Sequence, residues 1–297
     1  MWEELQECIE RARAEVGPAV VSIGRTSRGC GVVVGPGRVV TNAHNLRGDT
    51  TKVTFADGRA ETGRLQGADP DTDLAVIAVD TATVQAPAWA EIAPAPGQPV
   101  FALSLSSSGT TRVTFGTVSA VDRAFRGPRG RWISGSIEHT APLPRGSSGS
   151  AVVDPAGRLV GISTHRLGEG FYLALPAVAD LRIRIDALGR GEVPKRPRLG
   201  VGLAPLGAAR QLRRAVGLPE QDGLLVRLVE DNSAAGRADI RVGDLLTAIA
   251  GRSVRTHDDL YDALDRHTVG QVLAVRLIRG AAEVEVSVTC GEPPENG

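Results

Sequence analysis

Residues 144–150 read Pro-Arg-Gly-Ser-Ser-Gly-Ser and lie between two apolar, strand-like runs, 133–137 and 158–163. Glycines on both sides of Ser148 allow a tight turn, because glycine adopts positive φ without a steric cost. A serine on such a turn presents its hydroxyl, and neighbouring backbone N–H groups can face the carbonyl that the hydroxyl attacks. Ser148 is therefore the candidate nucleophile.

The best partners for this serine come earlier in the chain. His44 follows a buried strand-like run, and Asp73 comes just ahead of another, where a carboxylate can orient a neighbouring imidazole. Asp69 and Asp71 flank a proline and are interpreted as ordinary turn residues. The order His, Asp, Ser excludes an α/β-hydrolase, which needs Gly-x-Ser-x-Gly with its acid and histidine after the serine.

The composition excludes several classes of protein. A chain of 297 residues favours two domains, and its 34 basic and 34 acidic residues give no reason to expect nucleic acid or an anionic membrane as partner. The three cysteines lack metal-ligand spacing, so we expect no disulfide framework, metal or cofactor. No apolar run approaches the roughly 20 residues that span a bilayer, and the charged N-terminus does not resemble a signal peptide, which favours a cytoplasmic location.

The first two thirds of the chain read as a short helix followed by many strands. Residues 2–16 place Leu5, Cys8 and Ile9 at helical spacing, which predicts an amphipathic N-terminal helix. Short strands at regular spacing with glycine turns predict a barrel or sandwich. The expected strands are 20–23, 29–34, 38–41, 52–55, one ending near 66, 74–79, 99–105, 111–121, 131–138, 151–153, 158–164 and 171–175, followed by a helix ending near 188.

The remaining third reads as a separate domain. Residues 189–198 contain two prolines and are interpreted as a linker. Thr256 and Asp259 form the Thr-x-x-acid pattern of a capping box, which predicts a helix over 257–267. The expected strands here are 199–203, 223–229, 243–250, 272–278 and 282–288.

Taken together, three motifs resemble the HtrA (Deg) family of serine proteases: Thr41-Asn-Ala-His44, Asp73-Leu-Ala-Val76 and Gly146-Ser-Ser-Gly149. The segments Ser233-Ala-Ala, Gly243-Asp-Leu and Asp259-Leu follow the order of a PDZ domain. The resemblance runs from about 18 to 288 and implies a mainly β fold, a chymotrypsin-like double β-barrel followed by an α+β PDZ domain. The implied domains are an N-terminal helix at 1–17, a protease domain at 18–188, a linker at 189–198, a PDZ domain at 199–290 and a tail at 291–297.

The resemblance also implies roles for individual residues. Ser148 would attack the scissile carbonyl, His44 would take its proton, and Asp73 would hold the imidazole tautomer. The backbone N–H groups of Gly146 and Ser148 would form the oxyanion hole. Asn45 stands where the family usually has valine, which we interpret as a peripheral change.

Two further features bear on what is bound. A peptide C-terminus would add as a strand beside 199–203, its carboxylate held by N–H groups around Leu199 and Gly200. Its last side chain would lie between Val201, Leu260 and Leu264, although Leu264 is equally well interpreted as a core residue.

The sequence limits the identity of P1, the substrate residue that carries the scissile carbonyl. Pro142 stands where trypsin-like enzymes place an acid, so Lys or Arg at P1 is not expected. Glutamyl endopeptidases have histidine at the position of Ser163, so an acidic P1 is not expected either, and an aliphatic or small residue is the default. Arg145, His165 and Arg166 are interpreted as solvated loop residues.

The resulting hypothesis is an ATP-independent endopeptidase of protein quality control that acts on unfolded or damaged proteins. Family members are commonly trimers joined by N-terminal segments, and Trp2 with the amphipathic face behind it is a plausible counterpart. The competing hypothesis is a peptide-binding chaperone or scaffold with an idle protease fold. The family resemblance favours the cell envelope or periplasm over the cytoplasm, if a targeting segment has been removed.

Overall fold

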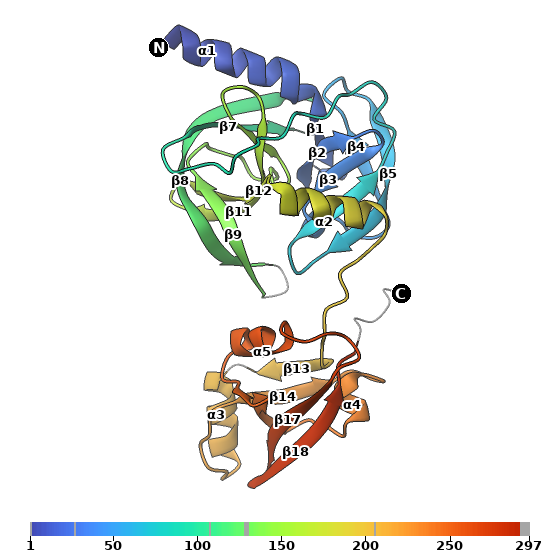
Figure 1. Ribbon diagram of the computed structural model, residues 1–297, viewed down its shortest axis with the longest axis vertical. Coiled ribbons are helices and arrows are strands. Elements are labelled where there is room, and N and C mark those ends of the chain that lie inside the picture. The colour runs from blue at the N-terminus through green and yellow to red at the C-terminus, as the bar shows by residue number, and fades with distance from the viewer. Residues whose placement is uncertain (1, 27, 107, 128–130, 205, 292–297) are drawn as a thin grey trace. The chain divides into compact units, whose positions relative to one another are not determined.

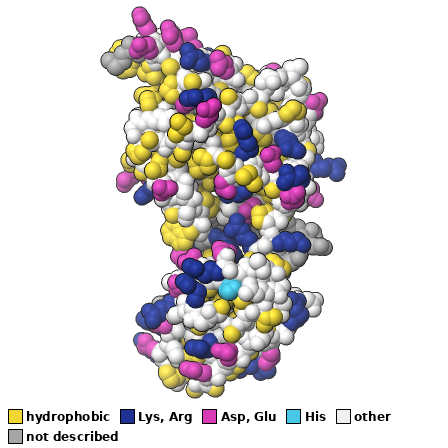
Figure 2. Space-filling view, in the orientation of Figure 1, with side chains coloured by type: hydrophobic (Ala, Val, Ile, Leu, Met, Phe, Trp, Pro, Cys, Tyr) yellow, Lys and Arg dark blue, Asp and Glu magenta, His cyan; other side chains and the backbone are white. Residues whose placement is uncertain are grey.

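The computed structural model describes residues 2–26, 28–106, 108–127, 131–204 and 206–291. It divides into two compact units, Met1–Val193 and Pro194–Gly297, which are described separately (Figure 1). The division falls inside the segment 189–198, and residues 292–297 of the expected tail lie outside the described residues. Basic and acidic side chains are interspersed on the face shown in Figure 2, in keeping with their equal numbers.

The first half of the N-terminal unit is a six-stranded antiparallel barrel. Its strands are β1 (Val20–Ile23), β2 (Gly29–Gly35), β3 (Arg38–Thr41), β4 (Thr50–Thr54), β5 (Ala60–Asp69) and β6 (Leu74–Ala78). They close in the order β1-β2-β3-β6-β5-β4. Runs of valine, isoleucine and threonine favour such extended backbone because their branched side chains pack well on a pleated surface. Thr41 at the end of β3 pairs with Ala75 near the start of β6, which brings His44 toward Asp73.

The second half of the unit is a second closed barrel. Its strands are β7 (Pro99–Leu105), β8 (Thr111–Arg126), β9 (Trp132–His139), β10 (Ala151–Val153), β11 (Leu159–Gly168) and β12 (Phe171–Pro176). They close in the order β10-β11-β12-β9-β8-β7. Ser148 lies in the loop before β10, and β10 pairs with β11, so this loop runs beside β11.

Apolar side chains from both barrels form one core cluster. Val32 and Val40 of the first barrel belong to it together with Leu103 and Leu159 of the second. The helix α2 (Ala179–Gly189) adds three buried side chains to this cluster and packs on β5 and β6. Since burial of apolar surface is the main favourable term in folding, this shared cluster holds the two barrels as one unit.

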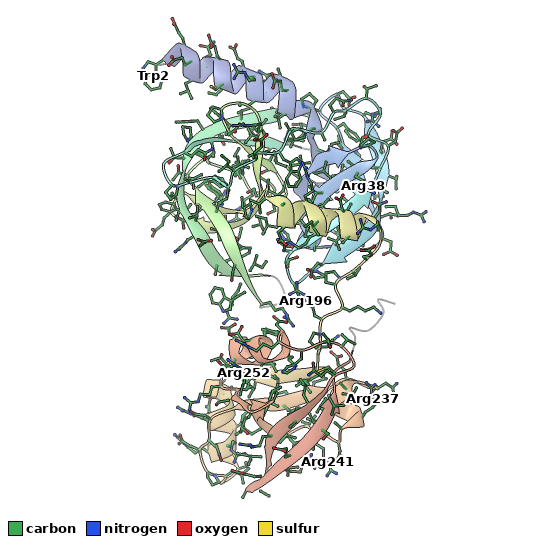
Figure 3. All side chains as sticks on the ribbon, viewed as in Figure 1. Trp2, Arg38, Arg196, Arg237, Arg241 and Arg252 are labelled. Atoms are coloured by element: carbon green, nitrogen blue, oxygen red, sulfur yellow. The ribbon has the colours of Figure 1, made fainter. Side chains whose placement is uncertain are left out.

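The N-terminal helix α1 (Trp2–Arg11) lies at the edge of this unit and contains no buried residue. Leu5, Cys8 and Ile9 are half-buried and pack against the core, as the amphipathic spacing predicts. Trp2 stands at the free end of the helix and is 78% exposed (Figure 3). The chain continues through the single turns η1 (Ala12–Val16) and η2 (Gly17–Ala19) into β1.

The C-terminal unit is an antiparallel sheet with three helices. Its elements are β13 (Val201–Ala204), α3 (Leu206–Ala215), β14 (Leu224–Val229), α4 (Ala234–Arg237), β15 (Leu245–Ile249), β16 (Arg252–Ser253), α5 (His257–Leu264), β17 (Val272–Arg279) and β18 (Ala282–Thr289). The sheet order is β13-β14-β15-β17-β18, with β16 beside β15, so β13 is an edge strand. The predicted capping box is confirmed, because the side chain of Thr256 accepts the backbone N–H of Asp259 and the side chain of Asp259 accepts the backbone N–H of Thr256.

Two closed barrels followed by an α+β unit confirm the predicted fold class. The helix α3 was not among the expected elements. Arg213 on this helix is buried, and its guanidinium donates to the carbonyl oxygens of Pro219 at 3.0 Å and Gly280 at 3.1 Å. β8 and β11 also extend further than expected, to Arg126 and Gly168.

Candidate active site

His44 lies on the single turn η3 (Ala43–Asn45), which begins two residues after the end of strand β3 of the first barrel. Its Nδ1 is 2.7 Å from Oδ2 of Asp73, and its backbone N–H donates to Oδ1 of the same carboxylate at 3.1 Å. The side chain of His44 is 36% exposed, whereas that of Asp73 is 2% exposed. With Nδ1 donating to the carboxylate, the lone pair is left on Nε2, which is the nitrogen available as a base.

Asp73 is held from both barrels. It has a positive φ of 57° just before β6, and its carbonyl accepts hydrogen bonds from Asn42 Nδ2 at 3.0 Å and Ala43 N–H at 3.2 Å. Its carboxylate also accepts a hydrogen bond from Thr164 Oγ1 at 3.1 Å. Asp69 instead accepts Asp71 N–H at 3.1 Å, in agreement with its interpretation as a turn residue.

Thr164 is a site residue that the sequence analysis did not identify. It lies on β11 where the pairing with β12 shifts register between Ser163 and His165, and such irregularities re-aim side chains. Its buried hydroxyl reaches Asp73, while its carbonyl accepts the hydroxyl of Ser148 at 3.2 Å. Thr164 therefore contacts both the carboxylate and the candidate nucleophile, although it is 91 residues from the first.

Asn45 is not peripheral, contrary to our expectation. Its side chain is fully buried, and Nδ2 donates to the carbonyl of Ser148 and to Thr41 Oγ1, both at 2.9 Å. The same Ser148 carbonyl accepts the N–H of Cys30 at 2.7 Å. The turn that carries His44 is thus tied directly to the loop that carries Ser148.

The loop around Ser148 requires glycine at two positions. Gly149 has a φ of 90°, its N–H donates to Ser163 at 2.6 Å, and a Cβ there would lie 2.1 Å from the Cys30 carbonyl oxygen. Gly146 has a φ of 80°. Among the residues that the structure describes, the N–H groups of Gly146 and Ser148 have no hydrogen-bond acceptor. Both donors are therefore available to a carbonyl oxygen bound next to the Ser148 hydroxyl.

Cys30 lies behind this loop and does not compete with Ser148 as a nucleophile. Burial raises the pKa of its thiol to about 11, so the thiol is neutral at physiological pH. Its Sγ lies 3.5 Å from the carbonyl oxygen of Leu105 and 3.7 Å from that of Gly146.

In the described part of the chain, no three or more His, Cys, Asp or Glu residues cluster closely enough to hold a metal ion. No helix of that part is long and apolar enough to cross a membrane.

A second histidine, His139, is fully buried inside the second barrel and stacks on Tyr172 with 5.7 Å between ring centroids. Burial lowers the pKa of its imidazole to about 4, and neither ring nitrogen has a partner among the described residues. In the sequence His139 simply ends an apolar run, which gives no sign of this environment. It contacts none of His44, Asp73 and Ser148 through a hydrogen bond.

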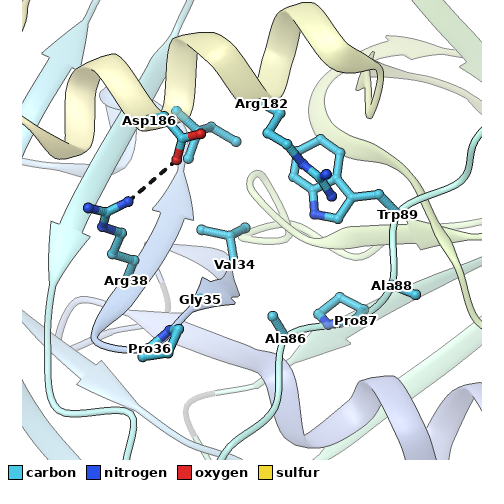
Figure 4. A pocket seen from close by; sticks show the side chains of 11 residues that line it. Val34, Gly35, Pro36, Arg38, Ala86, Pro87, Ala88, Trp89, Arg182 and Asp186 are labelled. Carbon is cyan, nitrogen blue, oxygen red and sulfur yellow. Dashed lines mark hydrogen bonds and ion pairs between the residues drawn. The ribbon is translucent and has the colours of Figure 1, made fainter.

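A cavity of about 510 Å³ lies between the β2–β3 turn, the segment joining the barrels and α2 (Figure 4). Arg38 pairs there with Asp186 at 3.4 Å, and the Arg182 guanidinium lies 4.7 Å from the ring centre of Trp89. None of the candidate catalytic residues lines this cavity. Its basic groups are already engaged, so it adds nothing to the site.

In the C-terminal unit, the candidate peptide-binding residues surround the edge strand β13. Leu199 is buried and Gly200 has a φ of 76°, and both precede this strand. Val201 is half-buried, whereas Leu260 and Leu264 on α5 are only 5% and 3% exposed. All four apolar side chains belong to, or pack against, the core cluster of the unit. The candidate peptide-binding residues and the core are thus largely the same residues.

The chain is similar to two families of domains. The family of trypsin-like peptidase domains matches residues 29–162, and the family of PDZ domains matches residues 197–290. The serine protease Do-like HtrA of Lactobacillus helveticus is 30% identical over 286 residues, which cover 88% of this chain and 68% of that protein. The periplasmic serine endoprotease DegP of Escherichia coli is 30% identical over 285 residues, which cover 90% of this chain and 58% of that protein.

Other proteins similar to this chain are also proteases. The chloroplastic protease Do-like 1 of Arabidopsis thaliana is 29% identical over 282 residues, and the chain spans 62% of its length. The HtrA-type protease AlgW, solved with a tripeptide, has a TM-score of 0.62 and 26% identity over 97% of this chain and 98% of that one. The serine endoprotease of Yersinia pestis, with a TM-score of 0.66 and 24% identity over 96% of this chain and 98% of that one, shares the fold.

Proposed function

Because the chain belongs to the HtrA family of serine endopeptidases, we propose that it cleaves peptide bonds of unfolded or damaged proteins without ATP. In this proposal Ser148 is the nucleophile, His44 the general base and Asp73 the residue that orients the base. The observation that carries the proposal is the hydrogen-bond network in which one residue, Thr164, contacts both Asp73 and Ser148. This network, built from two barrels, leaves Nε2 of His44 free for proton transfer.

Catalysis begins with a rotation of the Ser148 hydroxyl. In this mechanism the hydroxyl exchanges its hydrogen bond to the Thr164 carbonyl for one to Nε2 of His44. Ser148 Oγ then bonds to the scissile carbonyl carbon while His44 takes the hydroxyl proton, and the carbonyl oxygen becomes an oxyanion. The N–H groups of Gly146 and Ser148 receive this oxyanion. His44 returns the proton to the leaving amine, and water hydrolyses the acyl-enzyme by the same steps.

The C-terminal unit would select or regulate substrates by binding peptide C-termini. The open edge of β13 supports this role, because an extended peptide can add to an edge strand through backbone hydrogen bonds. Within the described residues, the N–H groups of Leu199 and Gly200 have no recorded acceptor and can hold a terminal carboxylate. Val201, Leu260 and Leu264 would contact the last side chain of the peptide.

We also propose that the chain assembles as a homotrimer through α1. The exposed Trp2 and the helix's lack of buried residues support a further contact on this element. Light scattering on the full chain should give three times the monomer mass of 31.0 kDa. A Trp2→Ala variant should shift toward the monomer, and a purified wild-type monomer would contradict the trimer.

For the compartment, the relatives support the cell envelope, since several are named periplasmic, including DegP of Escherichia coli. We therefore propose an envelope location for the natural gene product. Fractionation of the source cells, with the protein found in the cytosol alone, would overturn it.

The function is tested by casein cleavage and fluorophosphonate labelling of the wild type and Ser148→Ala. Loss of the nucleophile should lower turnover by about 10⁶ and abolish labelling. Ser150→Ala is the matched control, because the Ser150 hydroxyl lies two residues away, is buried and has no partner among the described residues. If the wild type neither labels nor cleaves, even with C-terminal peptides added, the chain is a chaperone or scaffold.

A further inference from the structure

Arg166 joins the two backbone segments that flank Ser148. It lies on β11, two residues beyond Thr164, whose carbonyl accepts the Ser148 hydroxyl. Its guanidinium donates a hydrogen bond to the carbonyl of Leu143, five residues before Ser148. It also lies 5.0 Å from the ring centre of Tyr172 on the neighbouring strand β12. Arg166 is exposed, as its interpretation as a solvated residue predicts, but it lies on β11 and not in a loop, and these two contacts hold its guanidinium.

The hydrogen bond from Arg166 to Leu143 joins the segment 142–147 to the segment 164–166 of β11. We call the space between these two segments the slot, and the P1 side chain must enter it. A scissile carbonyl bound at Ser148 has its oxygen toward the N–H groups of Gly146 and Ser148. The P1 side chain is attached one atom from that carbonyl, so it has to enter between the segment 142–147 and the segment 164–166 of β11. The chemistry of this slot sets the P1 preference in proteases of this fold.

Arg166 supplies the slot with a positive charge that nothing nearby cancels. In the part of the chain that the structure describes, no carboxylate lies within ion-pair distance of its guanidinium. The Leu143 carbonyl occupies one of its five N–H donors. The neighbouring His165 is turned onto Phe125, with 5.3 Å between ring centroids, and Pro142 is exposed but uncharged. The remaining donors of Arg166 form a planar fork that matches a carboxylate.

We propose that Arg166 is a specificity-determining residue that selects substrates with aspartate or glutamate at P1. This inference rests on the proposed protease function and deepens it by naming a substrate class. It reverses the expectation of an aliphatic or small P1 residue, which was based on Pro142 in place of an acid and on the absence of histidine at position 163. The charge comes instead from Arg166, three residues further along the same strand, whose remaining N–H donors bind the substrate carboxylate while one donor stays on the Leu143 carbonyl.

The test is a series of fluorogenic peptides that differ only at P1, with glutamate, glutamine, leucine, valine or lysine. Because hydrogen bonds between charged partners are stronger than neutral ones, kcat/KM for glutamate should exceed that for glutamine about 10- to 100-fold. Arg166→Met keeps the length of the side chain and should bring the glutamate to glutamine ratio close to one. Arg166→Lys should retain part of the preference.

The matched control is Arg126→Met. Arg126 lies in the same barrel with its guanidinium 4.9 Å from the ring centre of Trp132, so its removal tests general effects of losing a stacked arginine. This variant should keep the wild-type P1 preference. If Arg126→Met and Arg166→Met change the ratio equally, the effect is not local to the slot and the proposal is overturned.

Two further outcomes separate this inference from the proposed function. If the wild type labels with fluorophosphonate but cleaves leucine or valine better than glutamate, the protease stands and the role of Arg166 is overturned. If Arg166→Met accelerates cleavage at every P1 residue equally, Arg166 covers the slot without selecting, which also overturns the proposal. If the wild type does not label at all, the proposed function itself fails.

Discussion

The candidate site of the N-terminal unit consists of polar, hydrogen-bonded side chains, whereas that of the C-terminal unit consists mainly of apolar side chains. In the N-terminal unit, polar side chains such as Asn45, Asp73 and Thr164 converge through hydrogen bonds of 2.7–3.1 Å. In the C-terminal unit, Leu260 and Leu264 belong to the core cluster and are also the side chains of the proposed peptide groove. A hydrogen-bonded site can lose its chemistry while its fold persists, whereas an apolar groove made from the core loses binding and stability together. The following variants are ordered from the largest expected effect to the smallest.

Asp73→Asn tests the polar site most strongly. An amide at this position no longer favours the His44 tautomer with a free Nε2, and kcat should fall by about 10⁴ with the fold intact. The measurement is peptide turnover together with thermal unfolding. Asp71→Asn is the matched control, because Asp71 pairs with Arg131 at 3.4 Å and lies outside the network with His44, so it should change kcat less than threefold, or about 0.6 kcal/mol. Equal losses in both variants would remove Asp73 from the site.

Much of this site was predictable because its residue types carry chemistry on their own. Ser148, His44 and Asp73 stand in short motifs beside apolar strands, and those motifs can be recognised in sequence. Asn45 and Thr164 carry no such signal, because their partners lie 103 and 91 residues away and only the docking of two barrels brings them together. Sequence alone could not distinguish a buried asparagine bound to the Ser148 carbonyl from a surface substitution.

The same limit explains the other differences. Arg166 is exposed, as expected, and Arg213 is buried, yet each donates hydrogen bonds to backbone carbonyls that only the tertiary fold places nearby. Most strands, in contrast, were predictable from runs of β-branched residues between glycines. Local pattern therefore decided the elements, and long-range contacts decided which polar residues belong to the site.

Leu264→Ala tests whether groove and core are inseparable in the C-terminal unit. Removing a buried leucine side chain should lower the free energy of unfolding by about 2–5 kcal/mol and also weaken binding of a short peptide ending in valine. Val201→Ala, at a half-buried position, should weaken binding with a much smaller loss of stability. Calorimetry and peptide titration measure both effects. If Leu264→Ala leaves stability unchanged, the contrast between the two sites breaks down.

The next prediction concerns His139, a buried side chain of the N-terminal unit whose ring nitrogens have no hydrogen-bond partner among the described residues. Burial lowers its pKa from the ordinary 6.5 to about 4, so between these values the unfolded chain binds a proton that the folded chain does not. Its contribution to stability is fully present above pH 6.5 and is lost as the pH falls, by roughly 3 kcal/mol at pH 4. Scanning calorimetry across this window is the measurement.

His139→Phe should remove this part of the pH dependence while keeping a ring against Tyr172. The exposed His165, which also stacks on an aromatic ring, provides the control His165→Phe, and this variant should retain the wild-type pH dependence. Identical profiles for the wild type and His139→Phe would mean that His139 is already accessible to protons in the folded protein.

Asn45→Val gives the smallest expected effect and the finest test of the polar site. The Ser148 carbonyl keeps the Cys30 N–H, so losing Asn45 Nδ2 should lower kcat only about tenfold, with KM unchanged. Stability should change little, because the loss of the two Nδ2 hydrogen bonds is offset by removal of the buried side-chain oxygen, which has no partner among the described residues. Steady-state kinetics decides the matter, and an unchanged kcat would make the bond a structural detail.

The division of the site between the barrels also sets an order in time. Strands β1–β6, with His44 and Asp73, leave the ribosome before β7–β12, and Ser148 becomes positioned only when its carbonyl meets Cys30 and Asn45. A chain that is still being made thus has a base and a carboxylate but no placed nucleophile. In the proposed protease, cleavage therefore begins only after the second barrel has formed.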